Sequence, residues 1–319
     1  MNRNRVTMFC VFCLAFIFIA GTCSIFAESV SEEAAQTADT EMAQEETEGT
    51  DQYPGMPHMS YEEFPKMDGS LACVPLMESL IRAVTGCSEQ MAEEALINFG
   101  NTNPSYEKLV NKEIDIIFSY EASEGYKARL NNLKGLDLTP VGKDALVFLV
   151  NASNPVDSLT KEQIHDIYTG KIVNWSEVGG EDLPIKAFQR REDSGSQTMM
   201  RLLLMGDEEI PEKQMVVIEG MEGLIDALTE YDNTANALGY SVYYYASSMY
   251  AQDNLKFLAV DGVSPDNDSI RSGEYDLSNP FYCGLRADSD ENAVLLRDWL
   301  VSGEGQRFVE ELGYVSAGN

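Results

Sequence analysis

The stretch that decides the fold covers residues 151–196 and reads NASNPVDSLTKEQIHDIYTGKIVNWSEVGGEDLPIKAFQRREDSGS. Its first part predicts a helix over Thr160–Tyr168, with Thr160 as the N-cap. A glycine-containing turn follows, and then a strand that ends at Arg190. The polar residues after that strand lead into a second helical pattern, 196–204. A strand between two helices is typical of an α/β fold.

Helix and strand patterns alternate on both sides of this stretch. The chain has 319 residues, which favours two domains or lobes. Strands separated by helices indicate α/β lobes with mainly parallel sheets. The further helices are expected at 75–84, 221–230, 293–302 and 305–312, and the further strands at 114–118, 144–151 and 237–245.

Motifs along the chain resemble those of the phosphate-binding, substrate-binding proteins of bacterial ABC transporters. Within 151–196 the matching features are NP followed by LT, the helix ending IYTGKIVNW, the EVGG turn and R-x-x-x-SGS after a strand. Shorter matches lie in the same order along the chain, and the resemblance covers about residues 66–315. These shorter matches are Asp68-Gly69-Ser70, Asp115-Ile116-Ile117, Leu238-Gly239-Tyr240 and Gly303 to Tyr314.

This resemblance implies a two-lobe fold of the periplasmic-binding-protein type II, with two crossing strands and a ligand cleft between the lobes. The crossings are expected near 141–151 and 257–285. The first lobe is then discontinuous and comprises 61–150 and 257–319, whereas the second lobe comprises 151–256.

Two segments suit the binding of a tetrahedral oxyanion, which needs many short donors around it. Asp193–Ser196 immediately precedes the helix at 196–204, and Ser70 lies just ahead of the helix at 75–84. The first turn of a helix offers free N–H groups and a partial positive charge, and small residues let the backbone come close. Arg190 adds a charge-assisted, bidentate contact.

The resemblance assigns ligand-binding roles to two loops. In the first loop Leu71 contributes through its backbone N–H, and near the other loop Glu192 holds the arginine in place. The expected phosphate ligands are Ser70, Leu71, Arg190, Ser194, Gly195 and Ser196.

Two further loops depart from the family pattern. The second loop lacks the family's glycine run, so Thr102 and Ser105 are its candidate contacts. In the third loop, next to the candidate Ser119, either Glu121 or Tyr120 takes the place of an Asp that accepts the phosphate proton. A carboxylate there would repel a fully deprotonated anion. Phosphate and other oxyanions, such as sulfate or molybdate, therefore remain alternatives.

The charge of the chain excludes several classes of function. Lys and Arg total 22 and Asp and Glu total 53, for a formal charge of −31. This balance argues against nucleic-acid binding and against adsorption to anionic membranes. Two His are too few for a common metal motif, so neither a metal nor a cofactor is expected. There is no Walker loop, GxGxxG or GxSxG motif, and no enzyme activity is expected.

The N-terminal region predicts export. Residues 1–27 combine two arginines with an uncharged apolar run, which is typical of a secretory signal. Cleavage near Ala27, lipidation at Cys23 and an uncleaved anchor are the alternatives. Residues 28–60 are predicted to form an acidic, disordered tether. We therefore expect a protein outside the cytoplasmic membrane, secreted or tethered to the cell surface.

The leading functional hypothesis is a monomeric extracytoplasmic protein that captures inorganic phosphate by hinge closure and passes it to an ABC permease. An alternative is a surface-tethered sensor or adhesion protein with the same fold. Free thiols are favoured over a Cys73–Cys283 disulfide, and Cys87 is the third cysteine beyond the signal.

Overall fold

The computed structural model describes residues 52–96, 100–192, 194–208, 210–211, 215–218, 220–229 and 234–318. They belong to one compact unit, Gly49–Asn319. The predicted signal, with Cys23, and residues 28–51 of the predicted tether lie outside the described residues, as does Asp193. No described helix combines the length and the apolar character that crossing a bilayer requires.

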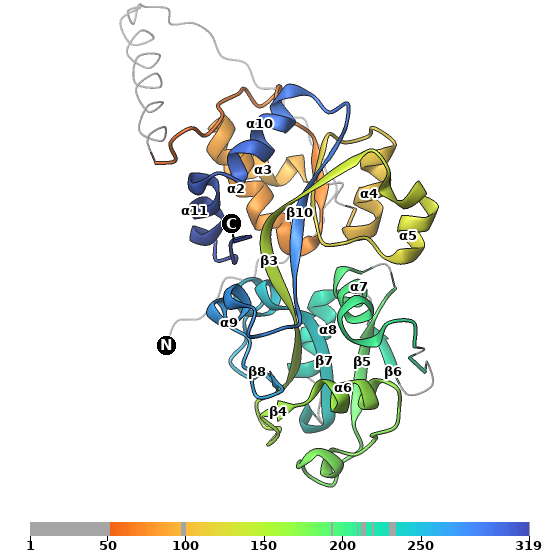
Figure 1. Ribbon diagram of the computed structural model, residues 1–319. Coiled ribbons are helices and arrows are strands. Elements are labelled where there is room, and N and C mark those ends of the chain that lie inside the picture. Colours follow the sequence, from red (N-terminus) through yellow and green to blue (C-terminus); the bar gives the residue numbers. More distant parts are fainter. Residues whose placement is uncertain are drawn as a thin grey trace, which may run out of the picture. The chain divides into compact units, whose positions relative to one another are not determined.

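A mixed sheet of eight strands runs through the unit in the order β1-β2-β10-β3-β7-β5-β6, with β8 paired to β3 (Figure 1). A small second sheet pairs β4 with β9. The strands are β1 (Met67–Gly69), β2 (Ile116–Ser119), β3 (Leu136–Asn151), β4 (Ser158–Leu159), β5 (Lys186–Arg190), β6 (Met215–Ile218), β7 (Ala237–Val242), β8 (Leu255–Phe257), β9 (Ala259–Val260) and β10 (Ser278–Arg286).

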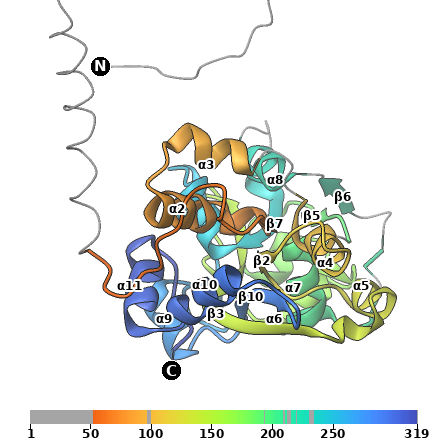
Figure 2. The same cartoon turned by 90° about the horizontal axis from the view of Figure 1, so that it is seen from above.

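Helices cover both faces of this sheet, and α2 lies beside α3 in both views (Figures 1 and 2). A 3₁₀ turn, η1 (Leu71–Cys73), leads into α2, and a π-helical segment, Arg201–Met205, continues α7. The helices are α2 (Val74–Thr85), α3 (Glu89–Ala95), α4 (Thr102–Val110), α5 (Glu124–Arg129), α6 (Lys161–Tyr168), α7 (Gly195–Met200), α8 (Met221–Thr229), α9 (Asn267–Ser272), α10 (Glu291–Leu300) and α11 (Gly303–Glu311).

The long strand β3 joins the two lobes. Its first part pairs with β10, from Leu136 to Ala145, and its second part pairs with β7, from Leu146 to Leu149. We call the β1–β2 edge with α2–α5, α10 and α11 the first lobe, and the β7–β5–β6 edge with α6–α8 the second lobe (Figure 1). The expected pair of crossing strands is thus β3 and β10.

The expectation of mainly parallel sheets is wrong at the centre of the molecule. β1–β2, β5–β6 and β5–β7 are parallel, but β3 pairs antiparallel with β7, β8 and β10, and β10 pairs antiparallel with β2. The physical reason is that β3 and β10 cross between the lobes in opposite directions. They pair along most of β10, so the outer parallel strands are joined by an antiparallel centre.

The strand β2 shows why the first lobe has helices on both faces. Alternate side chains of a strand point to opposite faces. Ile116 and Phe118 belong to the large hydrophobic core with α2, whereas Ile117 packs in a separate cluster with Tyr106 and Leu109 of α4. Both faces are therefore apolar, and β2 is buried along its whole length.

Local signals place the two best-predicted helices. α2 ends at Gly86, whose φ of 70° is the left-handed conformation that glycine adopts without strain. α6 begins after Thr160, whose side chain accepts from the Gln163 amide while the Gln163 side chain accepts from the Thr160 amide. Both helices match their predicted positions to within a residue or two.

The folded body begins before Tyr61, since part of the predicted tether packs on it. The Tyr53 ring lies edge-on to Phe308 of α11 at 5.0 Å, and its hydroxyl donates to the Glu311 carboxylate at 2.6 Å. Met56 is buried, and the Met59 amide donates to the Val84 carbonyl. The apolar residues around Pro54 thus distinguish this segment from the acidic stretch before it.

Candidate functional site

A small cavity of about 260 Å³ lies where the two lobes meet. Residues of both lobes line it, and eight of them are expected or candidate ligands: Ser70, Leu71, Thr102, Tyr120, Arg190, Ser194, Gly195 and Ser196. The remaining lining residues were not expected from the sequence; they are Ala72, Asn101, Pro104, Arg191, Gly220, Met221 and Val242.

Four helical segments begin at this cavity. They are η1 with α2, α4, α7 with its π-helical continuation, and α8. The first N–H groups of a helix have no partner within the helix and carry a partial positive charge. Their convergence on one small space makes the cavity suitable for an anion.

The second-lobe wall consists of the end of β5 and the start of α7. Arg190 is the last residue of β5, and its side chain is only 5% exposed. Ser194 caps α7 by accepting from the Gln197 amide. The Ser196 hydroxyl is buried without a hydrogen-bond partner among the described residues. This wall therefore combines a buried positive charge with a buried hydroxyl that has no hydrogen-bond partner among the described residues.

A buried tyrosine supports this wall from behind. The Tyr240 hydroxyl accepts from the Arg190 amide at 3.0 Å and donates to the Gln197 side-chain oxygen. Burial raises the pKa of Tyr240 well above its ordinary value, so its hydroxyl keeps its proton. Tyr240 thus holds the end of β5 against the first turns of α7.

The first-lobe wall depends on a close approach of β1 and β2. A Cβ atom at Gly69 would lie 1.8 Å from the Phe118 carbonyl oxygen, so only glycine fits there. This approach brings Ser70 next to the end of β2. The Ser70 hydroxyl bonds to the hydroxyls of Thr102 at 2.7 Å and Ser119 at 2.9 Å.

Tyr120 completes the first-lobe wall. Its amide donates to the Ser70 hydroxyl at 3.1 Å, and its own hydroxyl donates to the Asp144 carboxylate at 2.6 Å. Burial raises the pKa of Asp144 to about 6, although the hydrogen bonds that the carboxylate accepts from Tyr120 and neighbouring amides lower it. The Tyr120 hydroxyl therefore bonds to a buried carboxylate that was not expected from the sequence.

Four of the expected residues do not line the cavity. Ser119 and Ser105 lie behind it, bonded to the Ser70 hydroxyl and the Thr102 carbonyl respectively. Glu121 pairs with Lys127 and lines a different, larger cavity. Glu192 accepts hydrogen bonds from Arg201 at 2.9 Å and from Gln197 at 3.1 Å. A role for Glu192 in holding Arg190 stays a prediction.

The missed lining residues carry weak sequence signals. Gly220 and Met221 stand at the start of α8, which was predicted as a helix but not as part of a site. Asn101 has a φ of 66°, a conformation that Asn tolerates better than most residues, directly before α4. The signal that these residues share is their place at a helix start that follows a strand or a tight turn.

The described residues hold no group of three or more His, Cys, Asp or Glu arranged to bind a metal ion. Cys73, Cys87 and Cys283 are free thiols, and burial raises the pKa of Cys73 and Cys283 well above the ordinary value. The thiols of Cys73 and Cys283 are therefore protonated and pack as small apolar groups.

Two curated relatives are similar to this chain in sequence. The phosphate-binding protein PstS of Borreliella burgdorferi is 27% identical over 188 residues, which cover 57% of this chain and 66% of that protein. The phosphate-binding protein PstS of Bacillus subtilis is 28% identical over 176 residues, which cover 54% of this chain and 55% of that protein. The matches thus span less than two thirds of the length of either relative.

A solved structure from Clostridium perfringens, described as a phosphate ABC transporter substrate-binding protein with bound phosphate, has the same fold. Its TM-score is 0.61 at 24% sequence identity, and the match covers 79% of this chain and 98% of that one. A family model described as the PBP superfamily domain matches residues 76–302. That range is more than half of the chain and includes the crossing strands and most of the cavity wall. This chain therefore belongs to the family described as the PBP superfamily domain.

Proposed function

We propose that this chain binds inorganic phosphate in the small cavity between its lobes and delivers it to an ABC importer. The observation that carries the proposal is the convergence of four helix starts and the buried Arg190 on one cavity of about 260 Å³. The names of the two curated relatives and of the solved structure support phosphate as the ligand.

The proposed ligand contacts divide by lobe. Arg190 supplies the charge-assisted contact, and the Ser194–Ser196 segment supplies amides and the Ser196 hydroxyl. At the start of η1, Ser70 supplies a hydroxyl and Leu71 supplies a backbone amide, and Thr102 supplies a further hydroxyl. Together they surround a tetrahedral anion with donors.

The proposed action is binding and release without covalent chemistry. β3 and β10 connect the lobes, so bending along them would open and close the cavity. We assign no catalytic residue and propose that the chain is a binding protein and not an enzyme.

The proposed setting is the outer face of a cytoplasmic membrane or the periplasm. Residues 1–27 would direct export, with cleavage or lipidation at Cys23, and the acidic stretch that follows would tether the body. The proposed lobe limits are those expected from the sequence, except that the first lobe takes in the packed segment around Tyr53 and Met56. The proposed partner is the permease, bound by a monomer.

Isothermal titration calorimetry of the purified chain with phosphate and with sulfate, at pH 5.5 and pH 8, tests the proposal. Saturable phosphate binding at one site per chain, lost on changing Arg190, is the expected result. Preferential sulfate binding would keep the oxyanion site but replace the cargo. Absence of binding to either anion would contradict the proposed function and favour a sensor or adhesion role.

A further inference from the structure

Asp144 lies on β3 at the point where this strand passes from one lobe to the other. It pairs with Asn279 of β10, and two residues later β3 begins its pairing with β7. Its side chain is buried, with 2% of its surface exposed. No described basic residue forms an ion pair with it. Hydrogen bonds to the carboxylate therefore offset the free-energy cost of burying it.

The two carboxylate oxygens of Asp144 bond to different lobes. Oδ2 accepts from the Tyr120 hydroxyl of the first lobe at 2.6 Å. Oδ1 accepts from the Tyr244 amide, just beyond β7 of the second lobe, at 3.1 Å, and from the Ala145 amide at 2.7 Å. One buried side chain thus bridges the two halves of the molecule directly beside their junction.

The first-lobe end of this bridge forms part of the cavity wall. Tyr120 lines the cavity, and its Cδ2 atom would lie 3.0 Å from a Cβ atom placed on Gly195 of α7. The ring also packs edge-on against Phe281 of β10, with centroids 6.4 Å apart. Together with the Thr102 hydroxyl, which would lie 2.7 Å from the same Cβ atom, this ring therefore limits how closely the start of α7 approaches the first lobe.

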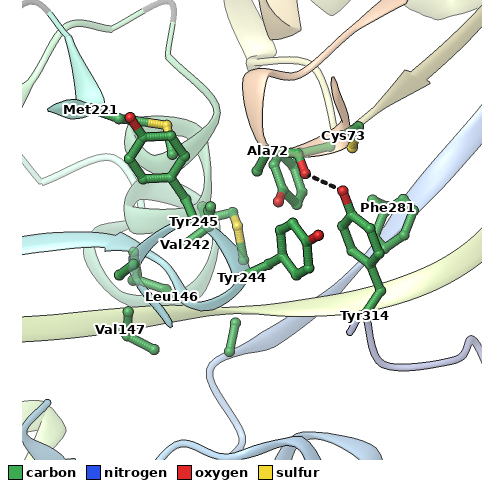
Figure 3. Packing of buried hydrophobic residues seen from close by; sticks show 14 of the residues in the cluster. Ala72, Cys73, Leu146, Val147, Met221, Val242, Tyr244, Tyr245, Phe281 and Tyr314 are labelled. Carbon is green, nitrogen blue, oxygen red and sulfur yellow. Dashed lines mark hydrogen bonds between the residues drawn. The ribbon is translucent and has the colours of Figure 1, made fainter. Parts of the chain in front are cut away.

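A second connection runs parallel to the first. The Tyr244 ring stacks on Tyr314 with centroids 3.6 Å apart, and the Tyr314 hydroxyl donates to the Ala72 carbonyl at 2.6 Å (Figure 3). Ala72 lines the same cavity. Figure 3 shows Tyr244 and Tyr314 facing each other below Ala72 and Cys73. The chain beyond β7 is thus linked to the first-lobe wall twice, once through Asp144 and once through Tyr314.

We propose that Asp144 is a positioning residue for the ligand cavity, which acts through Tyr120 to hold the first-lobe wall in register with the second lobe. The proposal rests on the proposed function, because it concerns the same cavity. A carboxylate that accepts several hydrogen bonds at fixed angles orients its donors more rigidly than packing alone. Losing it would leave the ring of Tyr120 free to shift and the ligand contacts misaligned.

A double-mutant cycle on phosphate affinity tests this role. Asp144→Asn keeps the shape of the side chain but brings an NH₂ group against donors, and we expect it to weaken phosphate binding about tenfold. Tyr120→Phe removes only the hydroxyl, and we expect a loss of about fivefold. If Asp144 acts through Tyr120, the double variant loses about tenfold and not the product of the two effects. Calorimetry measures the affinities, and thermal unfolding is recorded for each variant.

Tyr275→Phe is the matched control. The Tyr275 hydroxyl is also buried and donates to β3, at the Leu146 carbonyl at 2.9 Å, but Tyr275 does not line the cavity. We expect this variant to lose thermal stability with unchanged phosphate affinity. A similar affinity loss in the control, multiplicative effects in the cycle, or wild-type affinity in Tyr120→Phe would each overturn the proposal.

Tyr120→Phe carries the test alone if Asp144→Asn does not fold. Failure of the wild-type chain to bind phosphate or sulfate would overturn the proposed function, and this inference with it. Wild-type binding together with unaffected variants would overturn this inference alone.

Discussion

The two walls of the cavity differ in how their hydroxyl groups are bonded. In the first lobe the Ser70 hydroxyl bonds to the hydroxyls of Thr102 and Ser119 and to the Tyr120 amide. In the second lobe the Ser196 hydroxyl is buried with no hydrogen-bond partner among the described residues. One wall is organised by its own bonds, whereas the other holds a polar group that only a ligand or water would fill.

This difference predicts separate roles for the two walls in the shape of the cavity and in the affinity for the ligand. A buried polar group without a partner destabilises the folded protein by about 1–3 kcal/mol, and a ligand that bonds to it relieves that cost. Hydroxyls that already bond to one another gain less from a ligand, but they hold the wall in place. We therefore expect the second lobe to supply most of the binding free energy and the first lobe to supply the fit.

Removing the positive charge from the second-lobe wall should have the largest effect on phosphate binding. Arg190→Ala removes a guanidinium that is 5% exposed, and we expect phosphate affinity to fall about a thousandfold, by roughly 4 kcal/mol. Arg191→Ala is the matched control, since Arg191 lines the same cavity but is exposed. Its removal should weaken binding by no more than about threefold, because solvent screens exposed charges. Equal losses in calorimetry would contradict the assignment of Arg190.

The junction between the walls predicts a pH dependence of stability. The pKa of Asp144 is raised from 3.8 to about 6 in the folded chain, so its favourable contribution is complete below pH 4 and is lost as pH rises through 6. At 1.36 kcal/mol per pKa unit, the contribution of Asp144 to the free energy of unfolding should fall by up to about 3 kcal/mol between pH 4 and pH 7. Urea unfolding of the unliganded chain measures this change.

Asp144→Asn supplies the reference for that experiment, because the other titrating groups remain in it. The difference between wild type and variant should change across pH 4–7, while a constant difference would show that the carboxylate does not titrate there.

The close contact between the two walls at Gly195 predicts a smaller loss of phosphate affinity. A Cβ atom at Gly195 would lie 2.7 Å from the Thr102 hydroxyl and 3.0 Å from the Tyr120 ring. Gly195→Ala should therefore hold the lobes apart and weaken phosphate binding about thirtyfold, by roughly 2 kcal/mol. Gly303→Ala, at the start of α11 with open space around it, should leave affinity unchanged. Wild-type affinity in Gly195→Ala would mean that the lobes bind the ligand further apart.

The smallest effects test the bonding difference directly. Ser196→Ala removes the hydroxyl without a partner, so the unliganded chain should gain up to about 1 kcal/mol of stability while phosphate affinity falls about fivefold. Ser119→Ala removes a bonded hydroxyl outside the cavity, so stability should fall by about 1 kcal/mol with affinity nearly unchanged. Matching responses of the two variants, in thermal unfolding and calorimetry, would show that the walls do not differ.

The second-lobe wall could be predicted because its parts are neighbours in sequence. Arg190 and Ser194–Ser196 lie at a strand end and at the helix start that follows, and short-range signals such as the Ser194 cap are sufficient to align them. The helices α2 and α6 were predicted for the same reason, from their end signals at Gly86 and Thr160.

The first-lobe wall could be predicted only in part because its members come from separate segments. Ser70 is 32 residues from Thr102 and 50 residues from Tyr120, and nothing local aligns them. The choice between Glu121 and Tyr120 illustrates the limit. Glu121 forms an ion pair with Lys127 and lines another cavity, whereas Tyr120 lines this one.

The sequence by itself determined the α/β class, the helix ends, the proposed anion-binding loop after β5 and the family resemblance. Each of these can be read from short motifs and their order along the chain. Only the tertiary structure decided the antiparallel centre of the sheet, the wall around Ser70 and the place of Asp144 behind Tyr120. The physical reason is that these features arise where β3 and β10 pair across the lobes. That pairing sets which distant side chains are buried together and must satisfy one another's hydrogen bonds.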